Sequence, residues 1–279
     1  MGRGSRLPRG AREHPGTGNP ARLRGRGRGI SPGIQRRRGT AVSQLPPSVR
    51  EVPEIDVVIP TLNAAATLDA TLRSLSAARE EGLVRAVIVS DGGSTDGTAE
   101  IADAAGARVE RGPPGRGRQL AAGAMAARSP WVLFLHADTR LAAGWERTAR
   151  ELMADEGAQG RAAAFSFALD DPSIAARVLE WLVRWRCRIA ALPYGDQGLL
   201  MSRELYDEIG GYRPMPLMED VDVVRRIGSS RLVILPAKAV TSPARYRREG
   251  YVRRGVRNLF CLALYFLGVT PGTIARFYR

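Results

Sequence analysis

Acidic side chains that could hold a metal ion or move a proton stand at three places in this chain of 279 residues. Asp91 follows the run AVIVS, Asp138 follows the run WVLFL by two residues, and Glu219 and Asp220 are adjacent in the segment MEDVD. Carboxylate oxygens are the ligands that Mg²⁺ and Mn²⁺ prefer, and a carboxylate next to a hydroxyl can act as its general base. These residue types indicate metal-assisted or acid–base chemistry, provided that the fold brings the three places together.

The elements expected around these residues alternate between strand and helix. Compact apolar runs predict strands, and leucines or alanines at helical spacing predict the helices between them. In the first half of the chain the expected strands are residues 56–60, 86–90, 107–110 and 131–135, and the expected helices are residues 68–75, 98–105 and 117–127. This alternation predicts an α/β fold with a mostly parallel central sheet flanked by helices. Ligands of such sheets bind beyond the carboxyl ends of the strands, where Asp91 and Asp138 are expected.

The pattern of the chain changes after Gly144. Alternating or compact apolar residues predict further strands, and amphipathic spacing predicts longer helices. The expected strands are residues 162–169, 197–202 and 232–235, and the expected helices are residues 144–155, 174–190 and 251–267, with two more beginning near Arg203 and Glu219. The pair Glu219 and Asp220 is then expected in the first turn of a helix, where the helix dipole alone also favours acidic residues.

Two loops at the predicted carboxyl edge carry groups suited to binding a ligand. Pro60, Thr61 and Asn63 follow the first strand, and Asp91 and Gly92 open the segment DGGSTDGT after the second. Glycines let the backbone approach a ligand closely, and the Asp91 carboxylate can accept hydrogen bonds from a base or a ribose. Turn chemistry and helix capping explain the Thr and Asn of the first loop equally well.

Four segments, taken together and in order, resemble the family 2 glycosyltransferases of the GT-A fold. The segments are DVVIPTLNAAATL, VSDGGSTDGT, FLHADT and GDQGLLMSRELYDEIGGY followed by MEDVDVVRR, within about residues 54–235. The resemblance implies an enzyme that moves a sugar from a nucleotide-sugar donor to an acceptor, with inversion at the anomeric carbon. It also implies one domain over residues 54–279, with a nucleotide-binding half over residues 54–143 and an acceptor half over residues 144–279.

The resemblance implies roles for single residues. Asp138 matches the metal-binding carboxylate of the family's D-x-D motif, which implies Mn²⁺ or Mg²⁺ as a cofactor, and Asp220 matches the general base, with Glu219 beside it. The residues expected to bind the nucleotide sugar are Pro60, Thr61, Asn63, Asp91, Gly92, Arg118, Gln119 and Asp138. The residues expected on the acceptor side are Asp196, Gln197 and Arg225. A polar turn before a strand explains Asp196 and Gln197 about as well.

The chain departs from the family pattern at two points. His136 stands where the D-x-D motif has its first Asp. The His136 side chain could ligate the metal, donate a hydrogen bond to phosphate or serve only in packing. Its presence also leaves open the alternative that the protein is a non-catalytic relative of the family that only binds a nucleotide. The Q-x-x-R-W motif of processive members is absent, which predicts transfer of a single sugar. The acceptor is expected to carry a hydroxyl or carboxyl group, and similar small bacterial members are described as glycosylating carotenoid-derived acids or other lipids.

The net charge of +14 is concentrated at the amino terminus. Residues 1–50 contain twelve Arg and one acidic residue, Glu13, and so carry +11 of that charge. We expect residues 1–53 to be a disordered tail, in which the Arg-rich stretch 22–28 could bind RNA or anionic lipid. A nucleic-acid partner is not expected for residues 54–279. A sugar-phosphate nucleotidyltransferase is disfavoured, because PTLNAAATL stands where such enzymes carry a glycine-rich loop with Arg and Lys.

Two segments raise the question of membrane contact. Residues 174–190 combine Trp181 and Trp185 with several Arg, and the apolar residues 259–269 are flanked by Arg as well. Such helices can lie in a lipid interface, but helices whose Arg stems cover one face of the sheet are about equally consistent. No apolar run reaches the roughly 20 residues of a membrane span, and no secretory signal is visible. We therefore expect a cytoplasmic protein, with peripheral contact to the inner face of the membrane as an open alternative.

Overall fold

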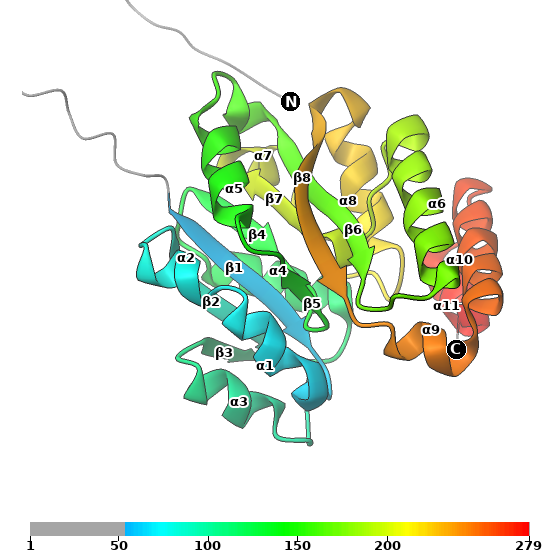
Figure 1. Ribbon diagram of the computed structural model, residues 1–279, viewed down its shortest axis with the longest axis horizontal. Helices are drawn as coiled ribbons and strands as arrows, with labels where there is room; N and C mark the ends of the chain where they lie inside the picture. Colours follow the sequence, from blue (N-terminus) through cyan, green and yellow to red (C-terminus); the bar gives the residue numbers. More distant parts are fainter. Residues whose placement is uncertain (1–53, 279) are drawn as a thin grey trace, which may run out of the picture. The chain divides into compact units, whose positions relative to one another are not determined.

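The computed structural model describes residues 54–278, which form one sheet with helices on both faces (Figure 1). The strand order is β3-β2-β1-β4-β7-β6-β8-β5. The strands are β1 (Ile55–Thr61), β2 (Val84–Asp91), β3 (Arg108–Arg111), β4 (Trp131–Phe134), β5 (Thr139–Leu141), β6 (Ala162–Leu169), β7 (Leu199–Ser202) and β8 (Leu232–Thr241). The helices are α1 (Ala65–Arg73), α2 (Ser76–Glu80), α3 (Thr98–Ala104), α4 (Arg116–Ala126), α5 (Trp145–Ala154), α6 (Ile174–Ala190), α7 (Arg203–Glu208), α8 (Glu219–Ile227), α9 (Ala244–Glu249), α10 (Tyr251–Phe266) and α11 (Pro271–Tyr278).

The strand pairing confirms the predicted α/β fold with a mostly parallel sheet. β3, β2, β1 and β4 pair in parallel, and so do β6 and β8. β7 pairs antiparallel with β4 and β6, and β5 pairs antiparallel with β8. Every strand expected from the sequence is present, and β8 continues six residues beyond its expected end at Leu235. β5 was not expected, because its three residues are too few to show an alternating pattern.

The strand directions bring distant loops to one edge of the sheet. Because β4 and β6 are both antiparallel to β7, the strands β1, β2, β3, β4, β6 and β8 all run the same way. The chain therefore leaves β1 at Thr61, β2 at Asp91, β4 at Phe134 and β8 at Thr241 along a common edge. The polar residues that follow these strands in the sequence are gathered there.

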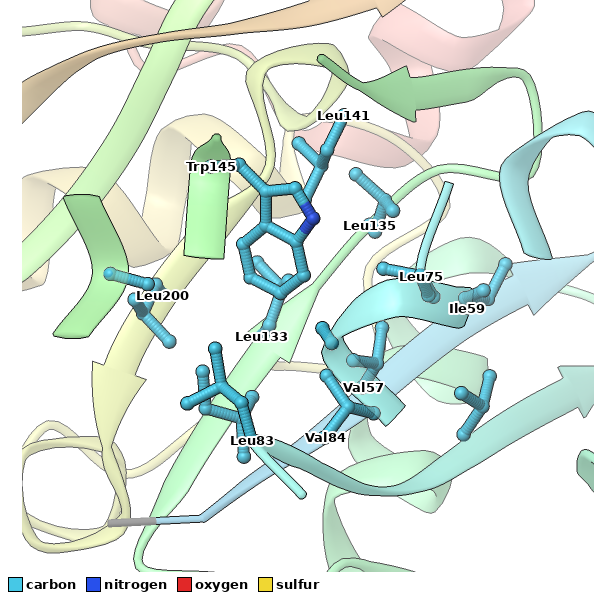
Figure 2. Close-up of a cluster of buried hydrophobic side chains, with 14 of the residues drawn as sticks. Val57, Ile59, Leu75, Leu83, Val84, Leu133, Leu135, Leu141, Trp145 and Leu200 are labelled. Carbon is cyan, nitrogen blue, oxygen red and sulfur yellow. The ribbon is translucent and has the colours of Figure 1, made fainter. Parts of the chain in front are cut away.

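Side-chain alternation along the strands supplies two cores, one on each face of the sheet. Val57 and Ile59 of β1 enter the core beneath α1, α2 and α5, in which Trp145 is fully buried (Figure 2). Val58 faces the opposite core, which includes residues of α4, α8 and α10. Successive strand residues point to opposite faces, so a strand that is apolar on both sides requires both layers. At Gly123 of α4 an added Cβ would overlap Val58, and glycine permits this close approach of helix to strand.

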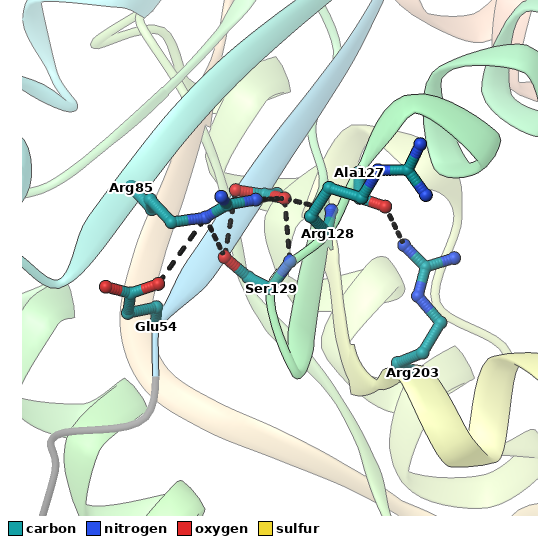
Figure 3. Close-up of polar contacts among 7 residues, drawn as sticks. Glu54, Arg85, Ala127, Arg128, Ser129 and Arg203 are labelled. Atoms are coloured by element: carbon teal, nitrogen blue, oxygen red, sulfur yellow. Dashed lines mark hydrogen bonds and ion pairs between the residues drawn. The ribbon is translucent and has the colours of Figure 1, made fainter.

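A buried charge anchors the amino end of β1. The Asp56 carboxylate accepts hydrogen bonds from the backbone N–H groups of Arg128 (2.5 Å) and Ser129 (2.8 Å) and from the Arg85 guanidinium (2.8 Å) (Figure 3). Ser129 Oγ donates a further bond of 2.9 Å. Burial acts to raise the pKa of Asp56, but these hydrogen bonds outweigh it and hold the pKa below its usual value. The cluster fastens the start of β1 to the loop between α4 and β4.

Some expectations concern residues that the structure does not describe. The predicted disordered tail over residues 1–53, with its expected binding of RNA or lipid, lies outside the described residues.

Among residues 54–278, none of the helices combines the length and the apolar character that a bilayer crossing requires. Cys187 and Cys261 are both buried and free.

Candidate active site

Two adjoining cavities lie at the carboxyl edge of the sheet. The first, here called the β1 cleft, has a volume of about 450 Å³ and is lined mainly by the loop after β1 and the start of α4. The second, the α10 cavity, has a volume of about 100 Å³ and is lined by Tyr194, Asp196 and residues of α8 to α11. The residues that line both cavities are Arg116, His136, Asp138, Leu217, Ser242 and Arg245. Molecules held in the two cavities would meet at this shared wall.

Asp138 presents its carboxylate at the shared wall. It lies between β4 and β5, and its backbone carbonyl accepts the N–H of Ser242 (2.9 Å), which holds the loop after β8 beside it. Within residues 54–278 the carboxylate takes part in no hydrogen bond or ion pair, and it borders both cavities. Its oxygens are therefore available to a ligand.

Gly195 lies against both His136 and Asp220. The His136 ring lies so close to Gly195 that an added Cβ would overlap it. The N–H of Gly195 donates to Asp220 Oδ2 (3.0 Å), and the N–H of Val221 donates to Oδ1 (2.8 Å). Burial lowers the pKa of His136 to about 4, and the positive charge of Arg116 acts in the same direction. The imidazole is therefore neutral at pH 7, and one ring nitrogen has a free lone pair.

Arg116 joins α4 to α8 at the shared wall. Its Nη1 lies 3.2 Å from Oε1 of Glu219, whose side chain is 1% exposed. Burial raises the pKa of Glu219, while Arg116 acts to lower it. A buried carboxylate needs a partner, and Arg116 is the partner of Glu219. Glu219 lines neither cavity. Of the adjacent acidic pair, Asp220 is the residue that faces the α10 cavity.

The loop after β2 is closed on itself by hydrogen bonds. The Asp91 carboxylate accepts them from Thr61 Oγ1 (3.0 Å), Ser94 Oγ (2.5 Å) and the N–H groups of Gly93 (3.0 Å) and Ser94 (2.9 Å). Burial acts to raise the pKa of Asp91, but these bonds hold it below its usual value. Pro60, Thr61 and Asn63 line the β1 cleft. Asp91 instead lines a separate hollow together with Arg111, and Gly92 lies between Asp91 and Gln119.

Gln119 and Gln197 brace the backbone around the site. Gln119 Nε2 donates to the carbonyl oxygens of Thr61 (2.6 Å) and Ser90 (2.9 Å), and so ties the ends of β1 and β2 together at the edge of the β1 cleft. Gln197 Nε2 donates to the carbonyl oxygen of Phe165 (2.9 Å), and its Oε1 accepts three further hydrogen bonds. Gln197 is fully buried and lines neither cavity. Its amide is occupied by other parts of the chain.

Asp196 lines the α10 cavity and has a buried carboxyl oxygen without a partner. Its Oδ1 is buried and makes no hydrogen bond to the described residues, and burial raises the pKa of Asp196 to about 6. Asn258 Oδ1 and Arg254 Nε, from the α10 residues that line the same cavity, are also buried and unbonded within residues 54–278. Buried polar groups are normally paired, so a polar molecule in this cavity would supply the missing partners.

The predicted residues Arg118 and Arg225 lie outside both cavities. Arg118 is exposed on α4, and the guanidinium of Arg225 lies 5.0 Å from the Phe266 ring. Residues at i and i+2 of a helix do not share a face, so Arg116 and Arg118 diverge and Arg116 reaches the wall. The residues that sequence reasoning missed are Arg116, Gly195, Ser242 and Arg245. Two of them had a signal in the sequence: Arg116 directly precedes the helix expected at the carboxyl edge, and Gly195 opens the segment GDQGLLMSRELYDEIGGY.

The donor atoms at the shared wall suit a divalent cation. Across residues 54–278, no three His, Cys, Asp or Glu side chains are grouped as a closed metal site requires. Asp138 and neutral His136 offer one carboxylate and one imidazole nitrogen. Mg²⁺ is usually held by one or two protein carboxylates together with substrate phosphates. Two protein ligands beside a cleft therefore fit a cation that is bound jointly with a diphosphate.

The fold defines a class of α/β proteins whose ligands bind at the carboxyl edge of the sheet, where both cavities lie. The sequence profile of glycosyl transferase family 2 matches residues 56–215. The chain therefore belongs to glycosyltransferase family 2 and is a nucleotide-sugar-dependent transferase. The family resemblance seen in the sequence is confirmed, while the segment MEDVDVVRR (residues 218–226) lies beyond the matched residues.

Solved structures of two glycosyltransferases are similar to this chain. Mannosyl-3-phosphoglycerate synthase from Rubrobacter xylanophilus is 20% identical, with 78% of this chain and 76% of that chain covered and a TM-score of 0.51. Glucosyl-3-phosphoglycerate synthase from Mycobacterium tuberculosis, in complex with Mn²⁺, UDP and glucosyl-3-phosphoglycerate, is 25% identical, with 74% and 78% covered and a TM-score of 0.47. Comparison with curated proteins gives no match. The first of these similarities supports the GT-A fold.

Proposed function

We propose that this protein transfers a single sugar from a nucleotide sugar in the β1 cleft to a hydroxyl or carboxyl group in the α10 cavity. The observation that carries the proposal is the shared wall, where Arg116, His136 and Asp138 border both cavities. Thr61 and Asn63 line only the β1 cleft, and Asp220 and Asp196 line only the α10 cavity. Donor groups and acceptor groups are thus separated by the residues that would handle the diphosphate.

Asp138 and His136 would hold a divalent cation, Mn²⁺ or Mg²⁺. When bound, such a cation neutralises negative charge on a leaving diphosphate. Arg116 is fixed by the buried Glu219 carboxylate and adds a second positive charge at the same wall. A guanidinium suits phosphate oxygens, since its donors form a planar fork.

Asp220 would act as the general base toward a hydroxyl acceptor. Each of its oxygens accepts one backbone N–H, which orients the carboxylate and leaves further lone pairs free. The acceptor oxygen would bond to the anomeric carbon as its proton passes to Asp220 and the bond from that carbon to the diphosphate breaks. An acceptor carboxylate would need no base. Attack from the side opposite the leaving group inverts the anomeric carbon.

The acceptor would be held on the α10 side. The unpaired Oδ1 of Asp196 would accept a hydrogen bond from a second hydroxyl of the acceptor. Gln197 would contribute through the backbone that it braces, and Arg225 would act only from outside the cavity. More specifically, the acceptor would be a carotenoid-derived acid or another lipid. Its polar group would lie in the α10 cavity and its apolar chain outside the cavity.

The first test is donor turnover by the wild type and by Asp138→Asn. Hydrolysis and binding of a panel of nucleotide sugars are measured with Mn²⁺, Mg²⁺ or EDTA. We expect metal-dependent turnover of one donor, and a loss of roughly a hundredfold or more in Asp138→Asn. The control is Asp103→Asn, an exposed carboxylate on α3 far from either cavity lining. It should behave as the wild type.

Three outcomes would each remove a part of the proposal. If EDTA left turnover unchanged, the proposed role of the cation would be excluded, but the proposed sugar transfer would not be affected. Failure of the folded protein to bind any nucleotide sugar would overturn the assignment of the β1 cleft. Asp220→Asn should retain donor binding and lose transfer to hydroxyl acceptors, and retained transfer would exclude Asp220 as the base.

A further inference from the structure

The outer faces of α6, α10 and α11 expose most of the large apolar side chains that are accessible among the described residues. On α6 the exposed residues are Ile174, Val178, Trp181, Leu182, Trp185 and Ile189. Apart from the adjacent pair Trp181 and Leu182, they recur at steps of three or four residues, so they form one stripe along the helix. Trp181 is 52% exposed and Trp185 is 45% exposed, with ring centroids 5.9 Å apart. A pair of accessible indoles is unusual on a surface that meets only water.

The α10 and α11 helices continue this apolar surface. The exposed residues at this end of the chain are Val252, Val256, Leu259, Phe260, Phe266, Leu267 and Phe277. Phe260 of α10 and Phe277 of α11 meet edge to face, with centroids 6.3 Å apart. α6 and α10 pack against each other and lie side by side in Figure 1, with α11 next to α10. The three helices are here called the outer helical face.

The charges on the outer helical face are all of one sign. The exposed charged residues of the three helices are Arg177, Arg184, Arg188, Arg253 and Arg276. The only acidic residue within these helices is Glu180, whose side chain is 12% exposed and whose carboxylate accepts the Leu169 N–H and pairs with Arg177. Arginines around a Trp- and Phe-rich apolar surface complement anionic headgroups above acyl chains. In a symmetric pair of such faces, by contrast, these arginines would repel one another.

We infer that the outer helical face docks on an anionic lipid surface, with Trp181, Trp185, Phe260 and Phe277 inserted at the level of the acyl chains. The inference does not depend on the proposed transfer reaction. The opposite side of α10 supplies Arg254 and Asn258 to the α10 cavity. Docking therefore brings that cavity close to the membrane surface, where an acceptor with an apolar chain would reside.

Intrinsic tryptophan fluorescence of the full chain tests this inference. Trp131 and Trp145 are fully buried, so a change on lipid binding would report on Trp181 and Trp185 of α6. The protein is mixed with vesicles of phosphatidylcholine and phosphatidylglycerol whose acyl chains carry bromine, which quenches only indoles in contact with them. We expect quenching with anionic vesicles and little with pure phosphatidylcholine.

Variants locate the contact on the outer helical face. Phe260→Ser with Phe277→Ser keeps both Trp reporters and should lower vesicle binding by roughly tenfold or more. Arg184→Gln with Arg188→Gln should lower binding by roughly fivefold for each charge removed. The matched controls are Met125→Ser, at an exposed apolar residue of α4, and Arg147→Gln, at an exposed arginine of α5. Both controls should bind as the wild type.

Binding to vesicles without Trp quenching would overturn the inference, because the lipid contact would then lie away from Trp181 and Trp185. The inference would equally fail if the protein were a dimer in solution that Phe260→Ser with Phe277→Ser made monomeric, with no quenching in either form. In that case the outer helical face would be an interface between two copies. Unchanged thermal unfolding of the variants would show that each readout concerns a folded protein.

Discussion

Gly195 contacts two residues of the candidate site: its backbone bonds to one, and its lack of a side chain leaves space for the other. Its N–H holds Asp220, and its Cα leaves room for the His136 ring. Gly195→Ala would push against the ring and shift both groups. We expect donor turnover to fall by roughly a hundredfold, because displacements of about 1 Å have such effects on reacting groups. Gly160→Ala is the control, since an added Cβ there meets nothing within 4 Å. Wild-type turnover by Gly195→Ala would show that the contact is not needed.

Asp196 is expected to lower the stability of the protein at neutral pH. Its pKa is about 6 in the folded chain, owing to burial, and about 3.9 in an unfolded one. The cost of the buried charge is absent below pH 4, grows between pH 4 and pH 6, and is complete above that. Asp196→Asn should therefore stabilise the metal-free protein by roughly 3 kcal/mol at pH 8 and by little near pH 4. Urea unfolding in EDTA at both pH values measures this, and equal changes at both would contradict the assigned cause.

The site residues differ in how far the sequence could predict their positions. Thr61, Asn63 and Asp138 follow parallel strands, and that rule alone places them at the carboxyl edge. The orientation of a glutamine amide depends on which carbonyl groups lie near it, so the bracing roles of Gln119 and Gln197 could not be predicted. The direction of Arg116 depends on where α4 begins. The sequence pattern suggested Gly117, and the helix begins one residue earlier.

At the scale of elements, the attachment of β1 to the loop before β4 depends on one carboxylate. Asp56→Asn would remove the buried one of the two ionic partners of Arg85, leaving Glu54, and would leave one backbone N–H group poorly matched. We expect the free energy of unfolding to fall by about 2 kcal/mol at pH 7, as measured by urea denaturation. Asp69→Asn, on the exposed side of α1, should change it by less than about 0.5 kcal/mol. Equal effects of the two substitutions would refute the anchoring role.

The pH dependence of this attachment has a defined direction. Hydrogen bonds hold the pKa of Asp56 below its usual value in the folded chain. The contribution of Asp56 to stability is therefore complete above about pH 4, the pKa of an unfolded Asp. It is lost as the pH falls through the lower pKa of the folded state. The difference in stability between the wild type and Asp56→Asn should shrink below pH 4.

The elements of the first half were predictable because strand and helix alternate there with short connections. The second half has the same local patterns, but its strands do not pair in chain order. β7 inserts between β4 and β6, and β5 pairs with β8, about 100 residues later in the sequence. Nothing in a local pattern encodes such pairing. The lengthening of β8 beyond Leu235 follows from it, since β5 and the end of β6 supply the partners of residues 238–241.

At the scale of the whole molecule, we propose that residues 54–279 form a domain that functions without the preceding residues. Both cavities are lined entirely by residues 60–278. A variant lacking residues 1–53 should keep metal-dependent donor turnover, and any binding to RNA should be lost with the +11 charge of residues 1–50. Turnover assays and a filter-binding assay with RNA measure the two effects. RNA binding that persisted in the shortened protein would contradict the prediction that such binding depends on residues 1–50.

The residues that stabilise the fold at β1 and the residues that line the β1 cleft lie at opposite ends of the same strand. The Asp56 cluster lies at the amino end of β1, and Thr61 and Asn63 lie at its carboxyl end. Strand geometry places these ends about 20 Å apart. Substitutions that far apart usually have additive energetic effects. Directed evolution could therefore first raise the thermal tolerance of this enzyme at one edge of the sheet. The gain could then be used to tolerate destabilising changes of donor selectivity at the other edge.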